Sequence, residues 1–180
     1  QGYDIFFTSD ATFANAVTFQ NTGTLDLGNT TSDTFTFNGG VTESTGGTVT
    51  IAGAIVSSND AISFGNINVG QNLSVTSAGG AISIGNIISH GTNHDITITS
   101  SGGSANSVAV GTISGNIKTV AITGSTSVTL NGNITTNESS GNSVTVTGTT
   151  INTGAITIDT NATNDGAITF DGAIAGGNNN

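Results

Sequence analysis

Residues 81–87, with the sequence Ala-Ile-Ser-Ile-Gly-Asn-Ile, hold the pattern that decides the fold of this chain. Two aliphatic residues flank one small polar residue, and a glycine, a variable residue and another aliphatic residue follow. Alternation of this kind predicts a strand whose aliphatic side chains share one face while the serine points to the other. The glycine predicts a sharp bend, because glycine adopts backbone angles that other residues avoid. We therefore expect a strand, a corner and a second strand.

The same pattern recurs along the chain, which indicates a repeat protein. Two intervals between copies are 20 residues, from Ile62 to Ile82 and from Val108 to Val128. Periods of this length are typical of stacked coils. A β-sandwich also contains many short strands, but faithful repetition of one strand-corner-strand pattern favours a solenoid. The further copies, from close to loose, occupy residues 61–67, 107–113, 128–134, 168–174, 35–41 and 49–55.

We therefore expect an all-β chain folded as a parallel β-solenoid of roughly eight coils, each of about 20 to 24 residues. No window has the i, i+3, i+4, i+7 apolar spacing of a helix, so we expect essentially no α-helix. Stacked coils lie about 4.8 Å apart, which places equivalent residues in ladders. Asn66 and Asn86 are expected at matching corners, where their amides bridge successive coils. The residues expected to point outward are Ser63, Ser83, Thr97, Thr129, Thr145, Thr157 and Thr169.

The length of 180 residues suits one β-solenoid domain over residues 1–180. Residues 1–40 hold six of the eight phenylalanines and the single tyrosine, whereas residues 41–180 are expected to form regular coils. We expect residues 1–40 to form an aromatic-rich N-terminal coil or cap, or alternatively a segment that docks on a neighbouring subunit by strand addition. The first residues lack the basic region and apolar core of a secretory signal, so we expect a processed or excised segment.

Charged residues make up only 7% of the chain, against roughly a quarter in ordinary domains. Lys118 is the sole lysine or arginine, and the formal net charge is −10. Such a surface repels phosphate groups, so we expect no nucleic-acid partner. No apolar run approaches the roughly 20 residues of a membrane helix, so we expect no membrane insertion. Cysteine is absent, which excludes a disulfide framework and a thiol nucleophile.

A β-helix can also carry polysaccharide lyase or hydrolase activity, which is one alternative function. A lyase needs a basic residue that takes a proton, and this chain has only Lys118. A hydrolase needs paired carboxylates, whereas Asp159 and Asp171, about half a coil apart, are expected on different faces. We therefore expect no enzyme, no catalytic residue and no cofactor-binding residue. The scattered acids are Asp4, Asp10, Asp26, Asp33, Glu43, Asp60, Asp95, Glu138, Asp159, Asp165 and Asp171.

Two short motifs resemble metal sites. Residues 90–95, His-Gly-Thr-Asn-His-Asp, have a spacing that forms a metal site on a helix. They lie in a Gly- and Asn-rich stretch, so we expect a solvated loop. Residues 161–166, Asn-Ala-Thr-Asn-Asp-Gly, imitate the start of a calcium loop, but the twelfth position is Gly172 rather than glutamate. We expect a corner turn and no metal ligand, and calcium is the one cofactor left open.

Paired threonines raise a second alternative function. Thr97 with Thr99, and Thr145 with Thr147, resemble the paired threonines of flat ice-binding ladders. Equivalent pairs are expected to fail elsewhere, so the sequence predicts a broken array. The residues that break it are expected to be Ala109, Ala121, Asp159 and Asp171.

Two stretches resemble filamentous-haemagglutinin-type repeats: residues 73–80, Leu-Ser-Val-Thr-Ser-Ala-Gly-Gly, and residues 166–177, which begin Gly-Ala-Ile-Thr-Phe-Asp-Gly. The resemblance covers the chain from about residue 35 onward. Repeats of this family build the long passengers of giant secreted bacterial adhesins. The resemblance implies a right-handed parallel β-helix that is extracellular, on a bacterial cell surface, and used for adhesion, surface coating or filament building.

These observations lead us to expect a structural or adhesive module of a bacterial surface fibre or giant adhesin. Its expected partners are copies of itself or adjoining repeats of the same polypeptide, joined end to end. Host or surface receptors, or glycans, are further expected partners. An ice-binding β-solenoid and a carbohydrate-active β-helix are the alternatives.

Overall fold

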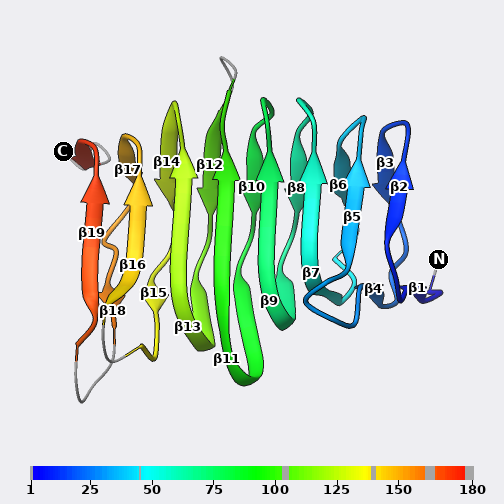
Figure 1. The fold of residues 1–180 in the computed structure, drawn as a ribbon, viewed down its shortest axis with the longest axis horizontal. Helices are drawn as coiled ribbons and strands as arrows, with labels where there is room; N and C mark the ends of the chain where they lie inside the picture. The colour runs from blue at the N-terminus through cyan, green and yellow to red at the C-terminus, as the bar shows by residue number, and fades with distance from the viewer. Residues whose placement is uncertain (1, 45, 103–105, 139–140, 161–164, 177–180) are drawn as a thin grey trace.

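The computed structural model describes residues 2–44, 46–102, 106–138, 141–160 and 165–176. These residues form a β-solenoid of about seven turns and contain no helix. The coils follow one another along the long axis of the molecule, from the N-terminal end to the C-terminal end (Figure 1). The predicted all-β parallel solenoid is therefore confirmed.

Over the described residues, one sheet of the solenoid, sheet A, has 12 strands. In the middle coils a long strand such as β7 runs through a corner and pairs with two shorter strands of the preceding coil, β4 and β5. The strands of sheet A are β1 (Ile5–Phe7), β2 (Ala11–Phe13), β4 (Leu25–Leu27), β5 (Thr34–Phe37), β7 (Val49–Ser57), β9 (Ile67–Ser77), β11 (Ile87–Ser100), β13 (Ile113–Gly124), β15 (Ile134–Thr135), β16 (Asn142–Thr147), β18 (Ile158–Asp159) and β19 (Ala167–Asp171).

The opposite sheet, sheet B, has eight strands over the same described residues. Each has three or four residues, and most alternate between the interior and the surface, as in β10, where Ser83 is exposed between buried Ile82 and Ile84. The strands of sheet B are β3 (Val17–Phe19), β6 (Val41–Glu43), β8 (Ile62–Phe64), β10 (Ile82–Ile84), β12 (Ser107–Val110), β14 (Ser127–Leu130), β17 (Thr150–Asn152) and β20 (Ile174–Gly176).

Parallel pairing brings the repeated pattern into register. Ile62 pairs with Ile82, Ile82 with Val108 and Val108 with Val128, and all four side chains are buried. Burial of such aliphatic columns contributes roughly 25 cal/mol per Å² of apolar surface removed from water. The predicted interior ladders are therefore present.

Coil length varies more than the sequence pattern predicts. Measured between paired residues, one coil takes 18 residues, from Val49 to Ile67, and another takes 26, from Ile87 to Ile113. The surplus lies at the corners, because the pairing of β11 shifts register between Ser89 and Ile96 and then resumes. The expected range of 20 to 24 residues is therefore too narrow.

The aromatic residues of the first coils fill the interior. Phe13 stacks on Phe37 with ring centroids 4.7 Å apart, and Phe7 meets Phe13 edge to face at 5.5 Å. Both arrangements are favourable for aromatic rings. Phe6 differs, since its side chain is 59% exposed. Docking of residues 1–40 on a neighbouring subunit remains a prediction.

In three copies of the repeated pattern, the glycine after the strand has a different role from the one expected. Gly65, Gly85 and Gly111 do not have positive φ, so the prediction that they supply unusual backbone angles is wrong. A Cβ on Gly85 would lie 2.9 Å from the carbonyl carbon of Gly65 and 2.8 Å from Asn66 Oδ1. Glycine is required there because the preceding coil approaches too closely for a side chain. In two other copies the glycine does have a positive φ, which is 95° at Gly53 and 145° at Gly172.

Substitution of Gly85 tests this close approach. We expect Gly85→Ala to lower the free energy of unfolding by about 1–3 kcal/mol, because the added methyl group overpacks the contact between coils. Urea unfolding monitored by circular dichroism measures the change. The matched control is Gly70→Ala, where the new Cβ would meet only Thr50 Cγ2 at 3.6 Å, an ordinary contact. Equal stability of the two variants would contradict the account.

Candidate functional site

The most regular surface of the molecule is the outward side of sheet A. Two parallel columns cross it, because alternate residues of each strand point outward and pair with their equivalents in the next coil. We call these residues the threonine face. Its first column is Thr34, Ala54, Ser74, Thr97, Ala121, Thr145 and Thr169, and its second is Thr36, Val56, Thr76, Thr99, Thr123, Thr147 and Asp171.

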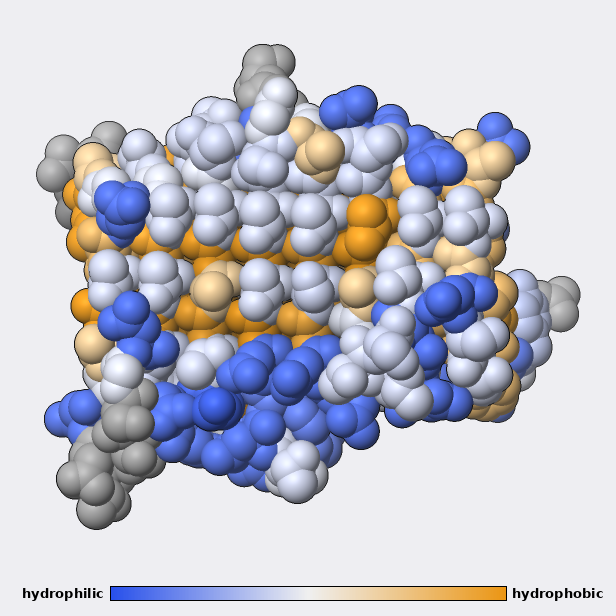
Figure 2. Space-filling view, in the orientation of Figure 1, coloured by the Kyte–Doolittle hydropathy of each residue, from blue (hydrophilic) through white to orange (hydrophobic). Residues whose placement is uncertain are grey.

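Figure 2 shows the threonine face as two straight rows of intermediate hydropathy with hydrophobic side chains beneath them. Strongly hydrophilic residues gather along one margin and leave the rows themselves nearly clear (Figure 2). Sheets ordinarily twist, and side-chain ladders are one of the features that keep a many-stranded sheet flat. The strands β5, β7, β9, β11, β13, β16 and β19 lie nearly parallel along this face (Figure 1).

The sequence placed only part of this array correctly. Thr97 with Thr99 and Thr145 with Thr147 do share one face, as expected. Ala109 and Asp159 are not on it, so the prediction that they break the array is wrong. Ala109 lies on β12 of sheet B, and Asp159 pairs with Thr135 through β18. In the described residues, the threonine array is interrupted by Ala54 and Val56 in one coil, by Ala121 in another and by Asp171 in a third.

Another column of outward residues lies on sheet B. Ser63, Ser83 and Thr129 belong to it, so the predicted outward residues are divided between two sheets. Thr157 lies outside the strands, at a corner, where its N–H donates to Asn133 Oδ1 at 2.9 Å. The sheet B column runs through Thr18, Thr42, Ser63, Ser83, Ala109, Thr129, Ile151 and Ala175.

Asparagine side chains connect successive coils at the corners. The Asn86 N–H donates to Asn66 Oδ1 at 2.8 Å, and the Thr112 N–H donates to Asn86 Oδ1 at 2.9 Å. The predicted position of Asn66 and Asn86 at matching corners is confirmed. Each amide oxygen accepts from the backbone of the next coil, which satisfies a donor where the strand pairing stops.

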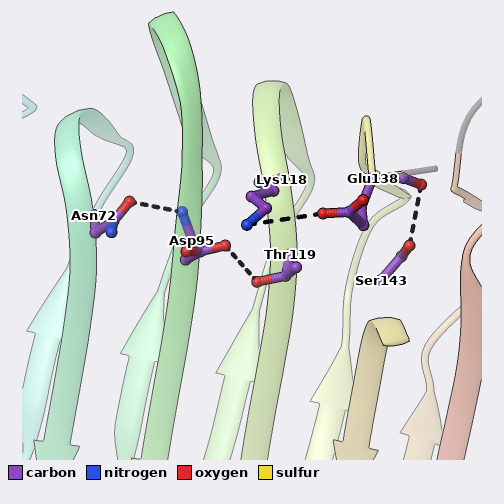
Figure 3. A network of polar contacts seen from close by, with 6 residues as sticks. All are labelled: Asn72, Asp95, Lys118, Thr119, Glu138 and Ser143. Carbon is purple, nitrogen blue, oxygen red and sulfur yellow. Dashed lines mark hydrogen bonds and ion pairs between the residues drawn. The ribbon is translucent and has the colours of Figure 1, made fainter. Parts of the chain in front are cut away.

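A second set of polar contacts connects successive coils near the corner within the long strands of sheet A (Figure 3). The Asp95 N–H donates to Asn72 Oδ1 at 3.0 Å, and Thr119 Oγ1 donates to Asp95 Oδ1 at 2.7 Å. Lys118 Nζ lies 3.8 Å from Glu138 Oε2, with the lysine side chain half exposed. An exposed pair of this kind contributes at most about 1 kcal/mol. The network therefore connects residues of successive coils.

Asp33 shapes the turn between β4 and β5. The backbone N–H groups of Asn29 and Thr30 donate to Asp33 Oδ2 at 2.8 and 3.0 Å. These two bonds favour the charged form and hold the pKa of the Asp33 carboxyl below its ordinary value of 3.8. The cause of the shift is therefore structural, namely the hydrogen bonds of a tight turn.

Two acids that the sequence did not pair are found together. Asp159 and Asp165 line an open hollow of about 370 Å³ at the C-terminal end, and Asp171 does not line it. Asp159 and Asp171 lie on β18 and β19, two strands of sheet A that do not pair with each other. The calcium-loop prediction rests partly on residues 161–164, which lie outside the described residues. Among the residues that are described, no group of three or more His, Asp or Glu side chains has metal-binding proximity.

The two histidines are in different environments. Both belong to β11, and His90 is exposed, whereas His94 is only 4% exposed. The prediction of a loop is therefore wrong for both histidines, and the prediction of solvent exposure is wrong for His94. The register of β11 shifts on both sides of this residue, which brings it level with buried Ile117 of the next coil. His94 thus occupies an interior position that the local Gly- and Asn-rich sequence does not indicate.

The apolar interior reaches the surface at both ends of the solenoid. At the C-terminal end, Ile168 is 44% and Ile174 is 55% exposed, and an open hollow of about 280 Å³ lies between them and Leu130. At the N-terminal end, the interior residues Ile5, Phe7 and Phe13 are only partly covered. Each end therefore presents apolar side chains beside the edge strands of both sheets.

Comparison with protein-family models, with curated proteins and with solved structures finds no match for this chain. Within the part of the chain that the structure describes, there is no helix with the length and apolarity to cross a membrane.

The asparagine corners provide a test of coil-to-coil bonding. We expect Asn86→Ala to lower the free energy of unfolding by about 0.5–1.5 kcal/mol, because the Thr112 N–H loses its acceptor. Asn86→Asp keeps an acceptor oxygen and is the matched control. Thermal melting of both variants measures the difference, and a melting temperature for Asn86→Ala equal to that of the wild type would contradict the assignment.

Proposed function

We propose that this chain is a structural, adhesive module of an extracellular bacterial surface fibre or giant adhesin. The observation that carries the proposal is the unbroken parallel ladder, which runs through every described coil and leaves apolar interior exposed at both ends. A ladder of this kind gains about 4.8 Å of length per coil. In this proposal the module gives a fibre length and stiffness, and this function requires no binding pocket.

The ends are suited to continuation of the ladder. The solenoid has edge strands at both ends: β1, β2 and β3 at one end, and β18, β19 and β20 at the other. Each of them pairs in parallel with a strand of the neighbouring coil. An edge strand offers unpaired backbone donors and acceptors to another strand. A coil of a neighbouring copy or adjoining repeat would therefore extend both sheets and cover Ile174 at one end or Ile5 at the other.

The composition supports a role outside the cell. Lys118 is the sole lysine or arginine, so proteases that cleave after basic residues have one site. Paired strands protect the backbone further, because cleavage needs local opening. The resemblance of residues 73–80 and 166–177 to filamentous-haemagglutinin-type repeats points to the same setting, with surface receptors or glycans as partners.

End-to-end assembly is tested by electron microscopy and by light scattering over a range of protein concentrations. We expect rods that lengthen as the concentration rises. Ile174→Asp introduces a charge at the open C-terminal end and is expected to stop this lengthening. The matched control is Ile151→Asp, because Ile151 is 36% exposed on the outer side of sheet B.

Two outcomes would contradict the proposal. If electron microscopy shows discrete round monomers at every concentration, the proposed mechanical role is contradicted. Lengthening that is equal in the Ile174→Asp and Ile151→Asp variants would show that the open end is not the contact.

A further inference from the structure

We infer that the threonine face binds ice. This inference goes beyond the proposed mechanical function and does not rest on it, since a solenoid can present this face whether or not its ends assemble.

The first argument is the two-dimensional repeat. Neighbouring coils place equivalent threonines about 4.8 Å apart, and alternate residues of one strand lie about 6.6 Å apart. The face is therefore a lattice with two fixed intervals, and hexagonal ice has repeats close to the shorter interval along one of its crystal axes. The second column holds Thr76, Thr99, Thr123 and Thr147 in four successive coils without interruption.

The second argument is the chemistry of the side chain. Threonine is branched at Cβ, which restricts its χ1 angle, so hydroxyl and methyl groups repeat in the same orientation along a column. Methyl groups order the adjacent water, and the hydroxyl groups hydrogen-bond to that water. Together they hold a layer of water at the spacing of the columns, and this layer can join an ice crystal.

The third argument is the distribution of charge. Between the coil of Thr34 and Thr36 and the coil of Thr145 and Thr147, neither column contains a charged residue. Charged groups lie at the edges of the array, where Asp171 ends the second column and Asp10 Oδ1 accepts the Thr34 N–H at 2.8 Å. Strongly hydrated groups would disturb an ordered layer, and they are kept to the margins (Figure 2).

Other occupants fit this face less well. A crystalline polysaccharide is bound through aromatic platforms, and neither column contains an aromatic residue. An added protein strand needs a free sheet edge, whereas the threonine face is the side of a sheet in which β5, β7, β9, β11, β13 and β16 are paired on both flanks. Ice is the partner that requires flatness, regular spacing and hydroxyl–methyl pairs together.

Thermal hysteresis and partition of the protein into growing ice test the inference directly. We expect the wild-type chain to lower the freezing point below the melting point and to enter the ice fraction. Thr99→Lys places a charge at the centre of the face and is expected to reduce both signals to the level of buffer. The matched control is Thr129→Lys, which makes the same change on the outer column of sheet B and is expected to retain them.

A gain-of-function variant keeps the test decisive if Thr99→Lys fails to fold, which circular dichroism would reveal. Val56→Thr repairs a gap in the second column and is expected to raise thermal hysteresis above the wild-type value. Absence of hysteresis and of ice partition in the wild type would overturn the inference. So would equal activity of folded Thr99→Lys and Thr129→Lys, or hysteresis in Val56→Thr that does not exceed the wild-type value.

Discussion

Backbone hydrogen bonding between parallel coils is the interaction on which the rest of this structure depends. It sets the distance between equivalent residues at about 4.8 Å, so each side chain must tolerate its own equivalent as a neighbour. Inside, this constraint places Ile62 on Ile82 and Ile82 on Val108, which is favourable because apolar surface is buried along a continuous column. At the corner, it leaves no room for a side chain on Gly85.

The same constraint explains the low charge of the surface. Like charges directly opposite each other on neighbouring strands repel, so a column of repeated acids or lysines would destabilise every coil. Threonine, serine and asparagine avoid this cost, and the chain accordingly has 7% charged residues. One regular stacking geometry thus produces both surfaces on which the proposals rest: the open apolar ends and the threonine face, whose columns contain one charged residue, Asp171.

The sequence predicted the features that depend on period alone. Alternation within residues 81–87 and its repetition were sufficient for the parallel solenoid, the interior columns and the asparagine corners. Features that depend on the path of the chain between strands were not predictable in this way. Coils vary from 18 to 26 residues, so spacing in the sequence assigned Ala109 and Asp159 to the wrong face. The register shifts around His94 likewise bury a residue whose neighbours in sequence are polar.

Cysteine pairs give the most direct test of parallel, in-register stacking, because the chain contains no cysteine of its own. Ser63 and Ser83 are paired residues of adjacent coils, about 4.8 Å apart and within disulfide range, whereas Ser63 and Ala109 are two coils apart. The account predicts that mild oxidation forms an intramolecular disulfide in Ser63→Cys/Ser83→Cys and not in Ser63→Cys/Ala109→Cys, as read by peptide mass. No disulfide in the first variant, or equal yield in both, would contradict it.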